Sequence, residues 1–459
     1  MRTLELLLLA LLTLRLIFPL TSFRARPAGS FASSAVLVAV LAFHVMLEGV
    51  RWNMALLYLA ALTVIARDLW FWVRARPIPT ASLQRRWLTR SAGVLVLGVA
   101  TLPGWLLPVP DLPAPTGPFA VGTDVIEVAL PEDVPRAAPG FDRARARLWY
   151  PANTVENTAA HRCGDTWLEH EATMLPALAQ RAGLPGFTLQ HLSHVRTHAC
   201  WGVPAAGDGT LPVLTFDHGR GGFAAQNTFL AEELASHGWL VVSLDHPGGA
   251  VLSVFQDGET IPFDDPSFGG GLEGSAYDDA IRTLGERWIA ETRAVLDALE
   301  RGEGPSTLIG RIDRNRLVTS GHSTGGGSAF GLCAVEPGCI ATVGLDPWML
   351  PTPPVLLDDG LTVPVAALFS DPALEFFEPA NRLAFDRLAG ATQDRGLATG
   401  AVTYSGAGHM DVTDVALLSP IADRLGLYVG PAPGREVLTM VRHDVLDVLG
   451  STGTLPMGR

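Results

Sequence analysis

A serine between two glycines near the middle of the chain could act as a nucleophile. Residues 316–327 read RLVTSGHSTGGG, in which Gly321, Ser323 and Gly325 form a G-x-S-x-G motif. An apolar, β-branched run precedes the motif and small residues typical of a helix follow it, which predicts a strand, a sharp turn and a helix. Glycines flank such a serine because a Cβ there would strike the neighbouring strand or helix. A plain glycine-rich turn is the alternative.

A serine hydroxyl becomes a good nucleophile only with a base and an acid nearby. A neutral imidazole must remove its proton, and a carboxylate must orient that imidazole. His409 directly follows a predicted strand, whereas His443 lies in a helical pattern, so His409 is the predicted base. Asp346 and Asp371 each follow a predicted strand, and the pattern alone does not separate these two candidates for the acid. The chain order of serine, acid and histidine is that of the α/β-hydrolase fold.

A glycine-rich turn earlier in the chain could complete an oxyanion hole. The predicted strand 211–217 ends in HGRGG, residues 218–222. In serine hydrolases with the order given above, the loop after this strand supplies one backbone N–H, and the residue after the nucleophile supplies the other. These two donors would be Arg220 and Thr324. An ordinary strand-to-helix turn is the alternative, because glycine is common in turns.

The elements that must position these residues alternate along the chain. Two strands open the pattern at residues 119–130 and 146–150, and further strands with helical patterns between them follow at residues 211–217, 239–244, 317–320, 340–345, 363–370 and 400–405. Strands and helices that alternate at this interval indicate parallel βαβ units. We therefore predict an α/β-hydrolase domain over residues 119–459, with residues 151–209 as an inserted lid or cap.

The first 110 residues differ from the rest of the chain in charge and hydropathy. They hold 11 arginines and three acidic residues, whereas the remainder has a net charge of −21. Four apolar runs in this part approach the ~20 residues that span a bilayer, and they lie at residues 4–20, 31–47, 54–73 and 92–108. We predict a region of four transmembrane helices over residues 1–110, followed by a proline-rich linker at 111–118.

Arginines between the apolar runs predict how the chain is oriented in the membrane. Two lie between the first and second runs, and five between the third and fourth: Arg24 and Arg26, then Arg74, Arg76, Arg85, Arg86 and Arg90. The positive-inside rule places both loops in the cytoplasm. We therefore expect a multi-pass protein of the cell membrane with its catalytic domain on the extracytoplasmic side. The acidic remainder would repel phosphates, so no nucleic-acid partner is expected.

Four cysteines all lie in the part predicted to be extracytoplasmic. An even number of cysteines on the oxidising side of a membrane is what disulfide bonds require. We predict that Cys333 pairs with Cys339, which closes a short loop beside the helix after Ser323, and that Cys163 pairs with Cys200. Four buried thiols are the alternative.

The ordered motifs of the chain resemble those of the platelet-activating factor acetylhydrolase family. The matching segments are LPVLTFDHGRGG, LAEELASHGWLVVSLDH, IDRNRLVTSGHSTGG, TVGLDPWMLP and SGAGHMDVTD, and the similarity extends over most of residues 119–449. Members are serine-dependent, calcium-independent phospholipases that remove short or oxidised acyl groups. The resemblance implies an acid in the motif that ends in Trp-Met, which is Asp346. It also implies Ser323 as nucleophile, His409 as base and the oxyanion donors named above.

The resemblance implies a serine esterase that cleaves short-acyl or oxidised phospholipid and lipid esters, and together with the apolar runs it predicts a bacterial, membrane-anchored member of the family. No cofactor and no metal ion is expected. The membrane region is not part of the family's usual forms, and residues 159–200 match poorly, so the acyl and head-group pockets are not carried over. Two other functions stay open: a general carboxylesterase or polyesterase acting on small extracellular esters, and a catalytically silent, hydrolase-like membrane protein that binds lipids or partners.

Overall fold

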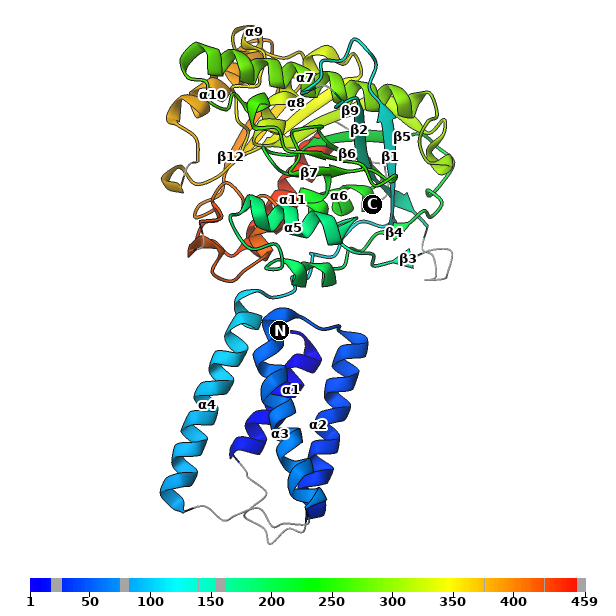
Figure 1. Ribbon diagram of the computed structural model, residues 1–459. Helices are drawn as coiled ribbons and strands as arrows, with labels where there is room; N and C mark the ends of the chain where they lie inside the picture. Colours follow the sequence, from blue (N-terminus) through cyan, green and yellow to red (C-terminus); the bar gives the residue numbers. More distant parts are fainter. Residues whose placement is uncertain are drawn as a thin grey trace. The chain divides into compact units, whose positions relative to one another are not determined.

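The chain forms two compact units (Figure 1). The computed structural model describes residues 1–17, 27–74, 82–138, 140–153, 162–374, 376–424 and 426–451. Unit 1 comprises Met1–Pro110, Phe187–Val195 and Leu418–Ile421, and unit 2 comprises Asp111–Gly186, Arg196–Leu417 and Ala422–Arg459.

A ten-stranded sheet forms the centre of unit 2. Its strands lie in the order β12-β11-β10-β9-β5-β6-β2-β1-β4-β3. Neighbours from β6 to β12 run parallel, whereas β2 is antiparallel to both β6 and β1. The strands are β1 (Ala120–Ala129), β2 (Arg143–Ala152), β3 (Arg162–Cys163), β4 (Cys200–Trp201), β5 (Leu211–Asp217), β6 (Leu240–Asp245), β9 (Ile312–His322), β10 (Cys339–Leu345), β11 (Val365–Phe369) and β12 (Thr399–Thr403). A separate hairpin pairs β7 (Leu252–Val254) with β8 (Thr260–Pro262).

Helices cover both faces of this sheet (Figure 1). One face carries α6 and α11, and the other carries α7, α8 and α10. The helices of unit 2 are α5 (Glu171–Arg181), α6 (Thr228–Ser236), α7 (Gly274–Glu300), α8 (Thr324–Val335), α9 (Pro354–Asp359), α10 (Pro379–Asp394) and α11 (Gly434–Ser451). This layered arrangement is the mostly parallel sheet with flanking helices that the sequence predicts.

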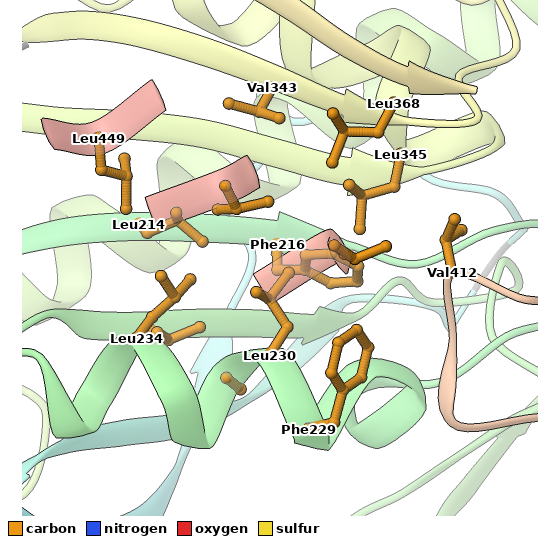
Figure 2. Packing of buried hydrophobic residues seen from close by; sticks show 14 of the residues in the cluster. Leu214, Phe216, Phe229, Leu230, Leu234, Val343, Leu345, Leu368, Val412 and Leu449 are labelled. Atoms are coloured by element: carbon orange, nitrogen blue, oxygen red, sulfur yellow. The ribbon is translucent and has the colours of Figure 1, made fainter. Parts of the chain in front are cut away.

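Alternation of side chains along the buried strands builds two cores. Leu214 and Phe216 of β5 pack with Phe229 and Leu230 of α6 (Figure 2). Val213, their neighbour in the chain, instead joins the cluster formed with α7. Successive side chains of a strand point to opposite faces, so one short apolar run serves both layers. Each fully buried side chain of this size contributes about 1.5–3 kcal/mol relative to an exposed one.

Part of the segment 151–209, for which a lid or cap is predicted, contributes to the edge of the sheet. Strands β3 and β4 pair with each other, and β4 also pairs with β1. The predicted disulfide between Cys163 and Cys200 is confirmed and joins these two strands. Each strand has only two residues, which is too short for a sequence pattern to indicate. The second predicted disulfide, between Cys333 and Cys339, is also confirmed.

Four α-helices make up most of the described part of unit 1, and one of them meets the requirements for a membrane span. They are α1 (Thr3–Ile17), α2 (Pro27–Leu47), α3 (Ala55–Val73) and α4 (Leu83–Leu106). Within the described residues, Trp52–Val73 is the helix long and apolar enough to cross a membrane, by length and composition, and Ala32–Leu47 is a shorter apolar helix. The expectation of four spans is therefore supported for one only.

The composition of the other helices explains this difference. Helix α1 has 15 residues and includes Glu5 and Arg15. Helix α4 begins with an arginine-rich turn and contains Pro103 near its end. An apolar run in the sequence therefore need not be an uninterrupted apolar helix of spanning length. Arg24, Arg26 and Arg76, which contribute to the predicted orientation, lie outside the described residues.

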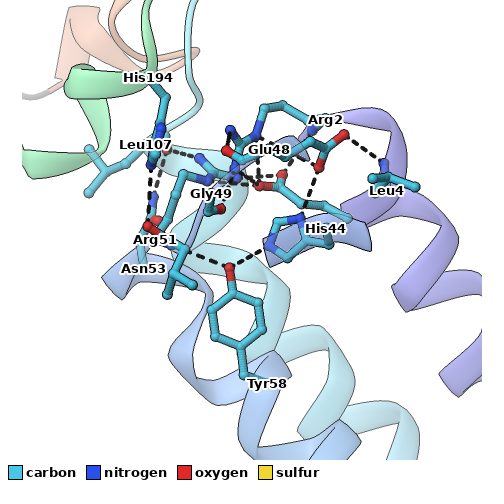
Figure 3. A network of polar contacts seen from close by, with 12 residues as sticks. Arg2, Leu4, His44, Glu48, Gly49, Arg51, Asn53, Tyr58, Leu107 and His194 are labelled. Carbon is cyan, nitrogen blue, oxygen red and sulfur yellow. Dashed lines mark hydrogen bonds and ion pairs between the residues drawn. The ribbon is translucent and has the colours of Figure 1, made fainter. Parts of the chain in front are cut away.

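The charged side chains inside unit 1 are paired with one another (Figure 3). Arg51 and Glu5 are both buried, with Nε 2.8 Å from Oε1 and a terminal nitrogen 2.5 Å from Oε2. His44 Nδ1 lies 2.9 Å from Glu48 Oε2, and His44 Nε2 lies 2.7 Å from the hydroxyl of Tyr58. A buried charge without a partner is strongly destabilising, so this network allows ionisable groups among apolar helices.

Candidate active site

Ser323 lies in a tight turn between β9 and α8. Its backbone angles are φ 55° and ψ −118°, a conformation that costs an L-residue on the order of 1–3 kcal/mol. A Cβ at Gly325 would lie 2.1 Å from the carbonyl oxygen of Asp217, and a Cβ at Gly321 would lie 2.4 Å from the backbone of Gly325. Both glycines are therefore required by close packing, and the predicted strand, turn and helix are observed.

His409 and Asp346 meet at the ends of two other strands. Asp346 follows β10 and His409 lies beyond β12, and both side chains are buried. His409 Nδ1 lies 2.6 Å from Asp346 Oδ2. A carboxylate only accepts hydrogen bonds, so Nδ1 carries a proton and donates it to this bond. The second ring nitrogen, Nε2, is then the one that can take up a proton.

Ser370 supports Asp346 from the neighbouring strand end. Its backbone N–H donates to Asp346 Oδ1 at 3.0 Å, and its hydroxyl donates to Oδ2 at 3.0 Å. Burial by itself would raise the pKa of Asp346, but the hydrogen bond and the charge of His409, with the Ser370 N–H, hold this pKa below its ordinary value. The carboxylate is thus kept ionised while it orients the imidazole.

Asp371, the alternative acid, is directed to other groups. Its carboxylate accepts the backbone N–H of Gly406 at 2.6 Å and that of Ala373 at 2.8 Å. These two hydrogen bonds lower the pKa of Asp371. The structure therefore places Asp346 at His409, while Asp371 stabilises the turn before the histidine.

The glycine-rich turn at residues 218–222 lies against the nucleophile. A Cβ on Gly219 would be 3.1 Å from Cβ of Ser323, so a side chain at this position would be packed tightly against the nucleophile. Thr324 is the first residue of α8, and the first N–H groups of a helix have no acceptor within the helix. Both predicted oxyanion donors, Arg220 and Thr324, thus belong to segments in contact with Ser323.

A comparison with known families places this geometry among ester hydrolases. Residues 108–260, which include β1 and the glycine-rich turn, match the family model described as platelet-activating factor acetylhydrolase, isoform II. The chain is therefore similar to the platelet-activating factor acetylhydrolase family. It is 26% identical over 292 residues to the platelet-activating factor acetylhydrolase of Cavia porcellus, a match that covers 59% of this chain and 62% of that protein.

Two other relatives extend the likeness. Cutinase 2 of Thermobifida cellulosilytica is 27% identical over 172 residues, which cover 38% of this chain and 49% of that protein. The solved structure of a ferulic acid esterase from Streptomyces cinnamoneus aligns with a TM-score of 0.56 at 23% identity and covers 74% of this chain and 91% of that one. The structural match shows an α/β-hydrolase-like fold. The named sequence relatives are carboxylic ester hydrolases, and the chain spans less than two thirds of the length of each.

Aromatic rings lie against the imidazole of His409. Phe376 stacks on His409 with ring centroids 4.5 Å apart, and Phe377 meets the imidazole edge-on at 5.1 Å. Tyr428 lies against Phe376 at 4.7 Å. Phe376 is 44% exposed and Tyr428 61% exposed, so the surface beside the base is apolar and open to solvent. The sequence motifs did not indicate this surface. The two adjacent phenylalanines soon after β11 were the feature of the sequence that could have indicated it.

A buried charged cluster supports the strand that leads into the glycine-rich turn. His246 Nε2 lies 3.1 Å from Asp217 Oδ1, and Nδ1 lies 2.8 Å from Glu291 Oε2. The ring of His246 stacks on Trp288 at 4.0 Å. Burial would lower the pKa of His246, but the two carboxylates outweigh it and raise this pKa to about 9. His246 is thus a charged group that neutralises two buried acids next to the turn.

One group of side chains among the described residues has the spacing of metal ligands. Possible ligand atoms of Glu5, His44 and Glu48, in unit 1, all lie within 4.8 Å of one another. The carboxylate of Glu5 already forms ion pairs with Arg51 and Arg2. Two guanidinium groups at this carboxylate disfavour a cation there, so the group is best described as part of an ion-pair network.

Proposed function

We propose that the chain is a serine carboxylic-ester hydrolase that acts through Ser323, His409 and Asp346. The observation that carries this proposal is the 2.6 Å hydrogen bond between His409 Nδ1 and Asp346 Oδ2. This bond leaves Nε2 as the proton acceptor. His322, which precedes Ser323 in the chain, bonds to the carbonyl oxygen of His409, so the loop of the base is held at the strained turn that α/β-hydrolases use for their nucleophile. The similarity to ester hydrolases supports the same assignment.

The residues divide the reaction into two steps. The Ser323 oxygen attacks the ester carbonyl while Nε2 of His409 takes the hydroxyl proton, and the backbone N–H groups of Arg220 and Thr324 bind the developing oxyanion. His409 then gives the proton to the departing alcohol, which leaves an acyl-enzyme. Water attacks this ester with the same histidine as base, and the acid and free Ser323 are released. Asp346 stays ionised and stabilises the imidazolium in both steps.

Short-acyl or oxidised phospholipid and lipid esters are the substrate class we propose. The name of the Cavia porcellus relative supports this class. The half-exposed rings of Phe376 and Tyr428 beside His409 also offer an apolar surface to an acyl chain. Turnover of phospholipids that differ only in the length of the acyl chain, from acetyl to palmitoyl, tests this class. A preference for palmitoyl would contradict it.

A general carboxylesterase or polyesterase is a second candidate because of the cutinase match. The two functions differ in how activity responds to a lipid surface. A lipid esterase should gain activity when a short-chain ester is presented in vesicles, whereas a general esterase should hydrolyse soluble p-nitrophenyl esters equally well without them. Polyester films offer a direct measurement of the second function.

We also propose that unit 1 holds the chain in the cell membrane as a multi-pass bundle, with unit 2 outside. Helix Trp52–Val73 supports this location. Large apolar side chains also point outward from all four helices, for example Leu7, Val38, Leu62 and Val96. The two disulfides fit an oxidising compartment. Protease added to intact cells should remove an epitope tag at the carboxyl terminus, and protection of the tag would contradict this orientation.

A fluorophosphonate probe tests the proposed activity most directly. It should label the full-length protein in detergent, and Ser323→Ala should abolish labelling. Ser320→Ala is the matched control, because the Ser320 hydroxyl is buried in the same strand and donates to Val343 O at 2.8 Å. This control should label normally. A folded wild-type protein that is not labelled would contradict the proposal.

A further inference from the structure

A chain of buried hydrogen bonds links the nucleophile turn to the loop that carries the base. Asn227 Nδ2 donates to the carbonyl oxygen of Val412 at 2.6 Å, and Gln226 Nε2 lies 3.3 Å from Asn227 Oδ1. Gln226 Nε2 also lies 2.9 Å from His322 Nδ1, and His322 Nε2 lies 3.0 Å from the carbonyl oxygen of His409. The three side chains are between 1% and 3% exposed.

The carbonyl groups at the two ends fix the direction of every bond in this chain. A carbonyl only accepts, so Asn227 turns its amide nitrogen to Val412 and its oxygen to Gln226. Gln226 must then donate through Nε2, both to that oxygen and to Nδ1 of His322. His322 accepts at Nδ1 and carries its single proton on Nε2, from which it donates to His409. One tautomer of His322 satisfies all of these contacts.

His322 is a neutral neighbour of the base. Burial, and after it the positive charge of His409, lower the pKa of His322 to about 3. The centroids of the two imidazole rings lie 4.4 Å apart. A second positive charge at this distance would destabilise the imidazolium that forms on His409. A neutral hydrogen-bond donor such as His322 avoids this repulsion.

We propose that His322 is a positioning residue that ties the loop of His409 to the nucleophile turn, with Gln226 fixing its tautomer. This inference rests on the proposed serine-hydrolase function. His322 is adjacent to Ser323 in the chain and bonds to the backbone of His409, so it sets the distance between nucleophile and base. A displacement of about 1 Å between reacting groups can cost about 100-fold in rate. The expected effect of losing this tie is therefore on kcat.

Two variants of His322 form a matched pair for the test. His322→Gln and His322→Met have unbranched side chains of similar length, but only Gln ends in an N–H donor that can reach the carbonyl of His409. Steady-state hydrolysis of p-nitrophenyl acetate by the full chain in detergent gives kcat and KM. His322→Met should lower kcat about 100-fold with KM little changed. His322→Gln should recover most of the loss and stay within about tenfold of the wild type.

Gln226 offers an independent measurement of the same tie. Gln226→Met removes the donor to Nδ1 of His322 and should also lower kcat. Because both substitutions break one chain of bonds, the double variant with His322→Met should be no slower than His322→Met alone. Ser243→Ala is the control for a purely structural loss, since the buried Ser243 hydroxyl donates to the carbonyl groups of Phe216 and Ala224. It should lower the unfolding temperature and keep kcat.

The outcomes separate this inference from the proposed function. Equal kcat values for His322→Gln and His322→Met, or losses that follow the unfolding temperature in all variants, would overturn the positioning role. A labelled wild type together with a fully active His322→Met would overturn only this inference. A folded wild type that neither labels with fluorophosphonate nor hydrolyses esters would overturn the function and, with it, the inference.

Discussion

At the scale of single residues, the carboxylate of Asp346 orients the base of the proposed mechanism. It is buried, it accepts from Ser370, and its short bond to His409 selects the tautomer that leaves Nε2 free. Removing the charge while keeping the shape of the side chain would let the imidazole adopt the opposite tautomer. In serine proteases, replacing the corresponding aspartate with asparagine lowers kcat by about 10⁴.

Asp346→Asn should therefore lower kcat/KM of ester hydrolysis by about 10⁴, because His409 loses both its orientation and its counter-charge. Asp371→Asn is the matched control and should keep most of the activity, since Asp371 bonds to the backbone of Gly406 and Ala373. Initial rates at several substrate concentrations measure both. The opposite ranking of the two variants would assign the acid to Asp371.

His246 makes the stability of the folded protein depend on pH. It faces the carboxylates of Asp217 and Glu291, the neutral ring of His218 and, through Glu291, the guanidinium of Arg287. Its folded pKa of about 9 lies above the ordinary histidine value of about 6.5. The stabilisation is therefore fully present below about pH 6.5 and is lost as the pH rises through about 9.

Thermal unfolding of wild type and His246→Gln between about pH 6 and pH 10 tests this assignment. The wild type should lose unfolding temperature on the alkaline side, because deprotonation leaves Asp217 without its positive partner and Glu291 with Arg287 alone. His246→Gln should be less stable at pH 6 and should lack this part of the decline. Parallel curves for the two proteins would show that His246 does not titrate in this range.

At the scale of elements, backbone atoms pack so closely around the turn between β9 and α8 that some of its positions have no space for a side chain. A Cβ at Gly325 would lie 2.1 Å from Asp217 O and 2.6 Å from His218 O. Both oxygens belong to the segment that enters the glycine-rich turn. Any side chain at residue 325 would therefore push apart the two segments that meet at Ser323.

Gly325→Ala should consequently lower the unfolding temperature strongly and abolish fluorophosphonate labelling. Gly390→Ala is the matched control, because Gly390 lies within α10 and a Cβ there would have no atom within 4 Å. The control should raise stability by about 0.5–1 kcal/mol, since alanine is the better helix former. Circular dichroism melts measure both, and equal melts would contradict the packing argument.

The elements that the sequence predicts well are those with local signals. The G-x-S-x-G turn follows from residues that are adjacent in the chain, and the parallel sheet follows from regular alternation of strand and helix patterns. Strands β3 and β4 have two residues each, so they have no pattern of their own and are held by a disulfide and pairing with β1. His322 bonds to Gln226, which is 96 positions away in the chain, and to His409, which is 87 positions away. Such pairs are set by the fold and have no local signature.

At the scale of the whole molecule, charge and hydropathy divide the chain into two regions suited to different solvents. Unit 2 holds nearly all acidic residues and buries its apolar side chains in layered cores. Unit 1 has its own apolar core, yet many large apolar side chains remain exposed on its helices. Exposed apolar patches much larger than a few hundred Å² are rare on soluble proteins. The membrane location that we propose would account for these exposed side chains.

Helix α3 provides the sharpest test of this account. Leu59 is 61% exposed and Leu62 is 52% exposed, whereas Leu57 and Ala61 of the same helix are fully buried. If the outer face contacts lipid, Leu59→Arg with Leu62→Arg should oppose insertion by about 5–7 kcal/mol. The double variant should then be extracted from membranes by carbonate, while the wild type stays in the pellet. Val355→Arg, at a 59% exposed position of α9 in unit 2, is the control and should behave as the wild type does. A wild type that is monomeric without detergent would contradict the membrane assignment. In that case the outer face of α3 would contact water, and arginine there would carry no such penalty.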